Sequence, residues 1–319
     1  MTSALHSSPT PRPNFFIVGA MKCGTTSWVD YLSTHPAITF GPEKEPHHFD
    51  ADLARTRVLT DQQYAALYAG CDEPVVGDSS VFYLYSEVAP KLIFEHCPDA
   101  RIAIFLRDHV AFLKSYHNHM GYLRAESKPL LEEAWRLSPI RRTEPRATAD
   151  VGPNCVEPRL LDYQSVARFA PQVQRYYDTF PADRIRVAWM DRWTPDPRAA
   201  YVEMLDFLSV EDDGRTEFTA VNLAPAHRSQ AAIRLLELAR PVVSPLLAPA
   251  RLMLGGRKLG LYRRLRRMNT KRTPPPPLSA DFEAELRDFY ATDREEIDQI
   301  IATAGGVQIP EEQSVAAST

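Results

Sequence analysis

The sequence predicts a single α/β domain with a central parallel sheet flanked by helices. An apolar run at Phe15–Val18 is followed by a glycine-bounded loop and then by a helical pattern. Strands alternate with helices along the chain, and Arg101–Leu106 is a continuous apolar run of the kind buried on both faces of a parallel sheet. We expect the domain to cover residues 14–308, between tails at 1–13 and 309–319.

The composition is that of an ordinary globular protein. Of the 319 residues, 44% are hydrophobic and 24% are charged, and the net charge of -4 argues against general binding of nucleic acid. The 4 cysteines show neither CxxC pairing nor metal-ligand spacing, so we expect no disulfide framework and no metal site. The first residues lack the apolar core of a signal peptide, and no apolar stretch reaches the roughly 20 residues that span a bilayer. We therefore expect a cytoplasmic location.

The first half of the chain is predicted to supply a βαβ unit. A helix is expected from Thr25 to His35, because apolar residues recur at helical spacing and Pro36 follows. The segment GPEKEPHHFD at 41–50 combines prolines with charged and imidazole side chains, which is typical of an irregular loop that carries polar chemistry. Residues 74–76 are predicted to form a short strand.

The second half continues the alternation. Residues 138–158 contain several prolines and little periodicity, which predicts a surface loop. A run of prolines precedes a final amphipathic helix expected from Ser279 to Ala302. The other predicted elements are a helix that follows Arg101–Leu106 and runs to Met120, helices at 129–137, 160–180, 197–208 and 234–253, and a strand at 184–190.

A basic segment covers residues 251–272, where no Asp or Glu interrupts the arginines and lysines. Two interpretations stay open. The segment could be a solvated face that follows an ordinary core helix, or a peripheral surface that meets an anionic membrane in which a lipid acceptor resides.

The stretch Asn14–Trp28 (NFFIVGAMKCGTTSW) is the strongest candidate site. A strand, a glycine loop and a helix N-terminus in succession surround a phosphate with backbone N–H groups and the positive end of the helix dipole. Lys22 precedes Gly24, and no Gly-Lys-Ser or Gly-Lys-Thr sequence occurs here, so the loop is not a Walker A sequence. Hydroxyls come from Thr25, Thr26 and Ser27, and Lys22 can reach a second anionic group. A plain glycine turn in a Rossmann-like sheet is the alternative.

Several segments resemble the sulfotransferases that use 3′-phosphoadenosine 5′-phosphosulfate (PAPS). GAMKCGTTSW at 19–28 resembles their 5′-phosphosulfate loop, and KEPHHFD at 44–50 resembles the KEPHFF segment of bacterial and heparan-sulfate-type members. IAIFLRDHVAFLKSYHNH at 102–119 resembles the 3′-phosphate segment, and PVVGDSSVFYLY at 74–85 resembles the substrate-side strand and turn. The resemblance runs from Asn14 to the final helix and implies a P-loop-like three-layer fold.

This resemblance implies roles for particular residues. Glu45 would be the general base that takes the proton of the acceptor, and His47 would orient or share that work. Lys22 would stabilise the charge that develops during transfer. The implied nucleotide-binding residues are Lys22, Cys23, Gly24, Thr25, Thr26 and Ser27 for the phosphosulfate and Arg107 and Ser115 for the 3′-phosphate, with Arg228 and the turn at 257–260 as candidates for completing the site.

We therefore expect PAPS-dependent transfer of a sulfuryl group to a hydroxyl, less readily to an amine, of a carbohydrate, a glycolipid or another small acceptor, without a metal. The sequence departs from the family pattern at His109, where Pro is common, at Phe112, where Arg is frequent, and at Ser79, where heparan-sulfate-type members often have Lys. The last departure argues against a glycosaminoglycan acceptor. Two alternatives are a P-loop-type nucleotide kinase and a nucleotide-binding module without catalysis. For Glu45 and Lys44 themselves, the alternative is a solvated charge pair in a loop.

Overall fold

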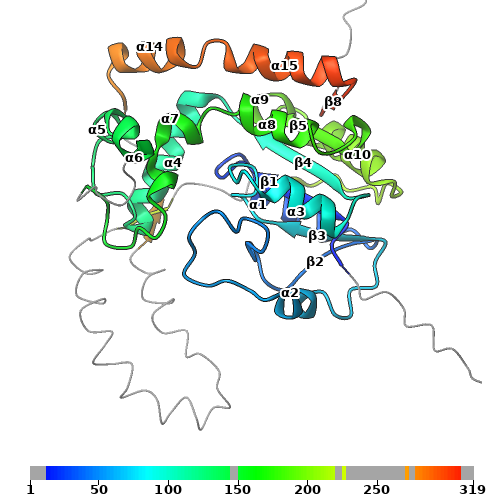
Figure 1. Ribbon diagram of the computed structural model, residues 1–319. Helices are drawn as coiled ribbons and strands as arrows, with labels where there is room; N and C mark the ends of the chain where they lie inside the picture. Colours follow the sequence, from blue (N-terminus) through cyan, green and yellow to red (C-terminus); the bar gives the residue numbers. More distant parts are fainter. Residues whose placement is uncertain (1–11, 144–149, 220–224, 228–269, 273–276, 310–319) are drawn as a thin grey trace, which may run out of the picture.

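A parallel sheet forms the centre of the fold. The computed structural model describes residues 12–143, 150–219, 225–227, 270–272 and 277–309. Within these ranges a 6-stranded sheet has the order β2-β3-β1-β4-β5-β8, and each neighbouring pair is parallel (Figure 1). The predicted α/β fold is therefore confirmed. The strands are β1 Phe15–Gly19, β2 Ile38–Phe40, β3 Val75–Ser79, β4 Arg101–Leu106, β5 Ile185–Trp189 and β8 Val307–Gln308.

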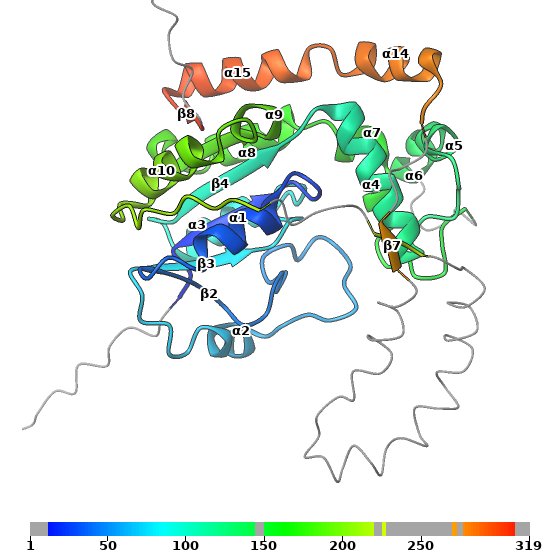
Figure 2. The same ribbon diagram turned by 180° about the vertical axis from the view of Figure 1, so that it is seen from behind.

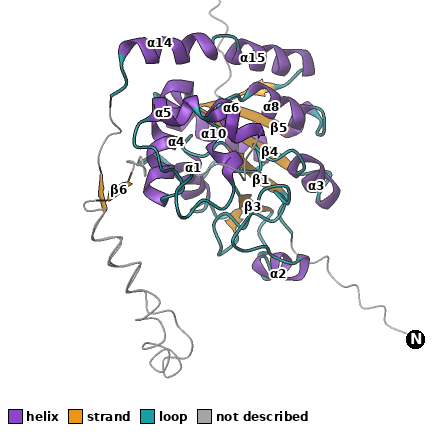
Figure 3. Cartoon of the chain, turned by 60° about the vertical axis from the view of Figure 1, so that its left-hand side comes forward, coloured by secondary structure: helices purple, strands orange, loops and turns teal. Residues whose placement is uncertain are grey.

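Helices cover both faces of this sheet. Figure 3 shows α3 (Ala89–His96) and α8 (Ala170–Tyr177) on one side of the strands, and α1 (Thr25–Leu32) and α10 (Pro197–Leu208) on the other. The strand order explains why α1 and α3 lie on opposite faces. The connection from β1 to β2 runs one way along the sheet and the connections from β3 to β4 and from β4 to β5 run the other way, so right-handed crossovers place α1 on one face and α3 and α8 on the other. The predicted three-layer arrangement is confirmed.

The two central strands bring the candidate site residues to one edge. In β1 and β4 nearly every side chain is fully buried, as expected for strands covered on both faces. Because neighbouring strands are parallel, their carboxyl ends meet at the same edge of the sheet. The glycine loop after Gly19, the turn at Asp78-Ser79-Ser80 and Arg107 therefore all start from this edge.

Several helices begin where the sequence provides a cap. Asp196 accepts a hydrogen bond from the Ala199 N–H at 2.9 Å, and Asp108 accepts one from the Ala111 N–H at 2.9 Å. Helix α10 follows Asp196 with the bounds that the sequence predicted. The remaining elements are α2 Asp61–Leu67, α4 His109–Leu123, α5 Leu131–Arg136, α6 Ser138–Thr143, η1 Pro158–Leu161, α7 Tyr163–Val166, η2 Ala182–Arg184, α9 Met190–Trp193, and the antiparallel strands β6 Pro225–His227 and β7 Thr270–Arg272.

The single helix predicted at 160–180 is wrong, since η1, α7 and α8 occupy this segment. Asp162 ends η1, and its side chain caps α7. The carboxylate of Asp293 accepts hydrogen bonds from the N–H groups of Phe169 and Ala170 at 2.9 and 3.1 Å, just before α8. These caps supply partners for backbone donors that a continuous helix would have satisfied internally.

The single helix predicted from Ser279 to Ala302 is also wrong. Figures 1 and 2 show two helices, α14 (Ala280–Phe289) and α15 (Asp293–Ala304), which lie end to end. The chain breaks between them because Tyr290 and Asp293 turn into the core. The Tyr290 ring stacks on His109 with centroids 4.9 Å apart, and Asp293 Oδ2 lies 2.8 Å from His109 Nε2. His109 thus fastens the C-terminal helices to the start of α4.

The surface loop predicted at 138–158 is wrong at its beginning, where α6 forms and Arg141 is 0% exposed. Arg141 binds Glu126 through two N–H···O contacts of 2.8 and 2.9 Å, and Tyr163 OH donates to the same carboxylate at 2.9 Å. This fully buried ion pair anchors α6 to the segment that follows α4. Polar anchors of this kind leave no hydrophobic periodicity in the sequence.

Replacing Arg141 with Met is expected to lower the free energy of unfolding by about 3–5 kcal/mol, because the Glu126 carboxylate stays buried without its partner. Urea denaturation of the two proteins measures this difference. Arg136→Met is the control, since Arg136 pairs with Glu285 at an exposed position. An equal loss of stability in both variants would contradict the assignment of Arg141 as a buried anchor.

Four sequence predictions fall wholly or mostly beyond the described ranges. The helix at 234–253, Arg228 and the turn at 257–260 lie outside them, and so does the basic segment apart from β7. At the C-terminal border Ile309 is buried, and its N–H donates to the Val187 carbonyl at 2.8 Å. No helix within the described ranges combines the length and the apolar character needed to cross a membrane.

Candidate functional site

The loop between β1 and α1 has the geometry of an anion cradle. Gly24 precedes α1 with φ of 88°, and no side chain caps this helix, so its first N–H groups are left for an external acceptor. A Cβ at Gly24 would lie 2.6 Å from the Trp193 ring. Glycine is therefore required both by the left-handed backbone and by the close approach of Trp193.

Two cations meet beside this cradle. Burial lowers the pKa of Lys22, and the charge of Arg107 lowers that pKa further, so the two side chains are close enough to repel each other. Among the described residues neither Lys22 nor Arg107 forms a hydrogen bond or an ion pair. Adjacent, half-buried cations without an ion-pair partner are unfavourable unless an anion compensates them. The arrangement fits a phosphate or sulfate group.

Cys23 contributes to this loop through its backbone. Its side chain is 0% exposed, and burial raises the pKa of the thiol to about 12. The thiol therefore stays neutral. Thr25 and Ser27 are also buried, whereas the hydroxyl of Thr26 is reached by Lys44, whose Nζ donates to Thr26 Oγ1 at 2.6 Å.

The segment 44–50 brings two carboxylates to one imidazole. Glu45 Oε2 lies 3.6 Å from His47 Nε2, and Asp50 Oδ2 lies 2.8 Å from His47 Nδ1. Arg55 forms an ion pair with the same oxygen, Asp50 Oδ2. The contacts form a series: Arg55 orients Asp50, Asp50 orients His47, and His47 orients Glu45. Sites in which a second residue holds a base in place have the same arrangement.

These contacts outweigh the effect of burial on the ionisable groups. Burial alone would raise the pKa of Glu45, but the hydrogen bond with His47 and the charge of Lys44 bring it below its usual value. Burial alone would lower the pKa of His47, yet the hydrogen bonds to Asp50 and Glu45 raise it. Glu45 is therefore ionised at neutral pH, as a proton acceptor must be.

The backbone of this segment is strained at Glu45 and His47, the two residues for which the sequence predicts a catalytic role. Glu45 has φ of 58° and His47 has φ of 52°, and a left-handed conformation costs a non-glycine residue about 1–3 kcal/mol. Such strain persists only where neighbouring contacts hold the chain. Here the His47 N–H donates to Ser80 Oγ at 3.1 Å and the His48 N–H donates to Tyr83 OH at 2.9 Å.

Most of the predicted site residues come together at the carboxyl edge of the sheet. The charge of Glu45 acts on Lys22, and Lys44 links the 44–50 segment to Thr26 of α1. Ser115 lies in the second turn of α4, nearly buried, and no hydrogen bond in the described chain joins it to Arg107. Arg228 lies outside the described residues.

Two contributors had no assigned role in the sequence analysis. Asp50 is the residue that fixes His47, and the i to i+3 spacing of His47 and Asp50 within KEPHHFD was the available signal. Lys44 bridges two motifs that are separated in the sequence, and its pairing with Glu45 at 3.6 Å coexists with that bridge. Only the folded chain places Lys44 near Thr26.

The pKa of His47 predicts a pH dependence of stability. Because the folded protein raises this pKa above the unfolded value of about 6.5, His47 stabilises the fold fully below that value. Its contribution is lost as the pH rises through the raised pKa. We expect His47→Asn to lose more stability at pH 5.5 than at pH 9, as measured by urea unfolding. A pH-independent difference would contradict the protonated pairing.

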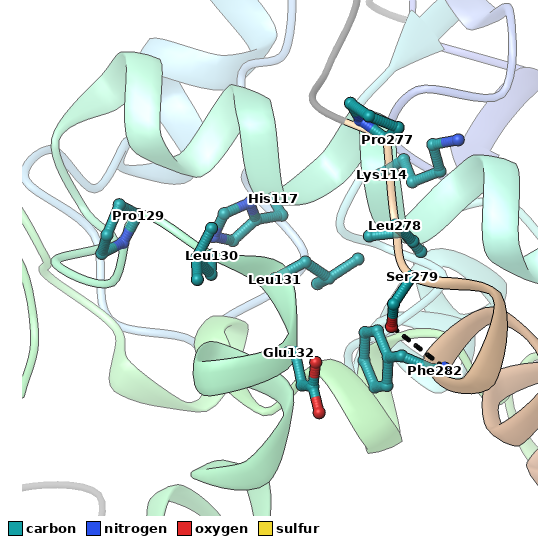
Figure 4. Close-up of a pocket in the computed structure, with 10 residues that line it drawn as sticks. All are labelled: Lys114, His117, Pro129, Leu130, Leu131, Glu132, Pro277, Leu278, Ser279 and Phe282. Carbon is teal, nitrogen blue, oxygen red and sulfur yellow. Dashed lines mark hydrogen bonds between the residues drawn. The ribbon is translucent and has the colours of Figure 1, made fainter.

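A cavity of about 160 Å³ lies apart from this cluster (Figure 4). It is formed between α4, α5 and the segment that leads into α14, and none of Lys22, Glu45, His47, Arg107 or Ser115 lines it. Its walls are mainly apolar, and they include Leu130, Leu131, Leu278 and Phe282. Within the described ranges, no group of three or more His, Cys, Asp or Glu side chains could hold a metal ion.

Comparison with known proteins gives consistent results. A solved sulfotransferase from Alicyclobacillus acidocaldarius superposes with a TM-score of 0.57 and 29% identity, over 79% of this chain and 99% of the other. The membrane-associated sulfotransferase kil1 of Dictyostelium discoideum is 28% identical over 121 residues, which cover 38% of this chain and 26% of that protein. The human carbohydrate sulfotransferase 15 is 51% identical over 35 residues, which cover 11% of this chain and 6% of that protein.

In sequence and in fold the chain is similar to sulfotransferases. No protein-family model matches it. The chain spans about a quarter or less of the length of the two curated relatives, and the likeness in fold rests on the solved structure.

Two departures of this chain from the sulfotransferase pattern have structural explanations. His109, where Pro is common, binds Asp293 and stacks on Tyr290. Phe112, where Arg is frequent, is buried and stacks on Tyr116 with centroids 5.2 Å apart. Both positions therefore serve packing of α4 against the core.

Proposed function

We propose that this sulfotransferase transfers a sulfuryl group from PAPS to a hydroxyl of a carbohydrate or glycolipid acceptor. One observation carries the proposal. Lys22 and Arg107, which have no ion-pair partner within the described part of the chain, lie beside an uncapped helix N-terminus, and the ionised Glu45 lies near them in a series of contacts with His47 and Asp50. An anion site next to an oriented base is what group transfer to a hydroxyl requires.

The binding residues act mainly through charge and backbone donors. The first N–H groups of α1 would hold the 5′-phosphosulfate, and the left-handed backbone of Gly24 would turn the loop into the helix there. Lys22 would stabilise the charge on the bridging and sulfuryl oxygens, as preorganised cations do in phosphoryl transfer. Arg107 and Ser115 would bind the 3′-phosphate, which distinguishes PAPS from ATP. When bound, PAPS supplies an activated sulfuryl group.

Glu45 would accept the proton of the acceptor hydroxyl. Its carboxylate is oriented by His47, and the ring of His47 is fixed by Asp50 on its other nitrogen. Burial lowers the pKa of His47, but its contacts with Asp50 and Glu45 raise it above the usual value, which favours the protonated ring in this pair. The contact with the ring would hold the carboxylate in place and limit its movement away from the acceptor.

The proposed acceptor class rests on the names of two relatives. One relative is named as a carbohydrate sulfotransferase and another as membrane-associated. A carbohydrate acceptor carried by a lipid at the cytoplasmic face of a membrane would suit both descriptions, with the basic segment at 251–272 as the contact. Co-sedimentation with anionic vesicles tests that contact, and absence of binding at low salt would remove it.

Thermal unfolding in the presence of nucleotides tests the donor. Adenosine 3′,5′-bisphosphate should stabilise the protein more than AMP or ATP, because it alone carries the 3′-phosphate for Arg107. Transfer of labelled sulfate from PAPS to pools of glycans and glycolipids then tests catalysis. Equal stabilisation by ATP would favour a kinase, and binding without transfer to any pool would favour a nucleotide-binding module.

A further inference from the structure

A buried carboxylate lies directly behind the 44–50 segment. Asp78, at the end of β3, is 1% exposed and has no cationic partner among the described residues. It accepts hydrogen bonds from Ser80 Oγ at 2.8 Å, Tyr64 OH at 2.8 Å and Tyr83 OH at 3.1 Å. Three hydroxyl donors thus converge on one carboxylate inside the core.

Two of these hydroxyls also accept hydrogen bonds from the backbone of the 44–50 segment. Ser80 Oγ accepts the His47 N–H at 3.1 Å, and Tyr83 OH accepts the N–H groups of His48 at 2.9 Å and of Phe49 at 3.4 Å. A hydroxyl has one proton, and each of these protons is directed to Asp78. The lone pairs are thereby left to face the backbone of the segment.

We propose that Asp78 is a positioning residue: through the hydroxyls of Ser80 and Tyr83 it fixes the backbone of the 44–50 segment and so the positions of Glu45 and His47. This inference rests on the proposed function and deepens it. The carboxylate makes Ser80 and Tyr83 acceptors, and the acceptors fix consecutive N–H groups beside the strained backbone at Glu45 and His47. Without the carboxylate, the hydroxyls could turn and the segment could relax to ordinary dihedral angles.

The alternative is that Asp78 only ends β3, and its surroundings argue against this. Burial raises the pKa of Asp78 to about 6, although the hydroxyls of Ser80, Tyr64 and Tyr83 act in the opposite direction. A strand end does not require a desolvated carboxylate. The third donor, Tyr64, stacks its ring on His48 with centroids 4.2 Å apart, so it too contacts the segment, but through its ring.

The test is Asp78→Asn, because the amide offers donors where the hydroxyls need an acceptor. We expect kcat to fall between about 10-fold and about 100-fold, with nearly unchanged affinity for adenosine 3′,5′-bisphosphate. Asp293→Asn is the matched control. Asp293 is as buried as Asp78, but it caps α8 and makes no contact with the 44–50 segment within the described residues. Its loss should therefore reduce stability and leave kcat unchanged. Unchanged kcat in Asp78→Asn, or an equal loss in both variants, would overturn the proposal.

A series of single hydroxyl deletions keeps the proposal testable if Asp78→Asn does not fold. Tyr64→Phe, Tyr83→Phe and Ser80→Ala each remove one hydrogen bond to Asp78. Only Tyr83→Phe and Ser80→Ala also remove an acceptor for the segment, and these two should lower kcat more than Tyr64→Phe does. Equal effects of the three on kcat would indicate a purely structural role.

Titration of the His47 ring by NMR gives a readout that does not depend on sulfate transfer. In Asp78→Asn the imidazole should lose its fixed contacts with Glu45 and Asp50, and its pKa should fall toward the ordinary value. An unchanged titration would overturn the positioning role. If the wild-type protein transfers no sulfate, or Glu45→Gln keeps its turnover, the proposed function fails, while this titration still decides what Asp78 does.

Discussion

Glu45→Gln is expected to reduce kcat by about 10²–10⁴-fold, the usual contribution of a general base. The amide keeps the size of the side chain and can still contact Lys44, but it cannot take the proton of the acceptor. Because Glu45 is ionised at neutral pH and oriented by His47, no other proton acceptor in the cluster matches its position. Transfer of labelled sulfate under single-turnover conditions measures this loss directly.

Nucleotide binding separates this role from a structural one. The negative charge of Glu45 acts on Lys22, so its removal leaves the anion site more positive. The dissociation constant of adenosine 3′,5′-bisphosphate should therefore stay similar or decrease, as isothermal titration calorimetry can show. Glu43→Gln is the control, since Glu43 lies in the same loop and pairs with Arg57 at the surface. Full turnover in Glu45→Gln would assign the proton transfer to another group.

The parts of the fold that could be predicted from the sequence are those set by local pattern. The apolar run of β4 identified a buried strand with its bounds, and Pro197 identified the start of α10. The glycine loop before α1 was recognisable because strand, turn and helix cap are contiguous. In each case the residues that determine the element lie within it or next to it.

The wrong predictions concern helix boundaries that are set by a side chain distant in the sequence. Asp293 caps α8 from more than a hundred residues further along the chain, and His109 pulls Tyr290 inward between α14 and α15. Likewise the anchor of α6 is the contact of Arg141 with Glu126. Periodicity within a window cannot report such contacts, because the partner is outside the window.

The candidate site shows the same division. Lys22, Glu45 and His47 were indicated by residues within short motifs. The link from Lys44 to Thr26 and the position of Asp78 behind His47 depend on how β1, β3 and the 44–50 segment align. Their roles therefore became visible only when the register of the sheet placed the strand ends side by side.

Lys22→Met is expected to lower kcat by about 10²–10³-fold, comparable to the loss of one preorganised donor to a developing charge. Methionine keeps most of the length and apolar stem of lysine. It also has a similar cost at φ of 68°, so the loop should keep its conformation. The change then removes little more than the charge. Lys91→Met, at an exposed position on α3, is the control for loss of a lysine.

Comparison with Arg107→Met distinguishes the two cations. If Lys22 acts on the charge that develops during transfer, its loss should appear mainly in kcat. If Arg107 binds the 3′-phosphate, its loss should appear mainly in the dissociation constant of adenosine 3′,5′-bisphosphate, and AMP should bind both proteins alike. The reverse pattern would exchange the two assignments.

The pH dependence provides an independent check on Lys22. Burial and the charge of Arg107 lower its pKa, so the ammonium should lose its proton, and the enzyme its activity, at a lower pH than an exposed lysine would require. Arginine keeps its charge at any accessible pH. Lys22→Arg should therefore retain part of the activity and shift the alkaline limb of kcat upward, whereas an unshifted limb would assign it to another group. His47 also titrates toward alkaline pH, but its loss of charge would affect Lys22→Arg and the wild-type protein equally.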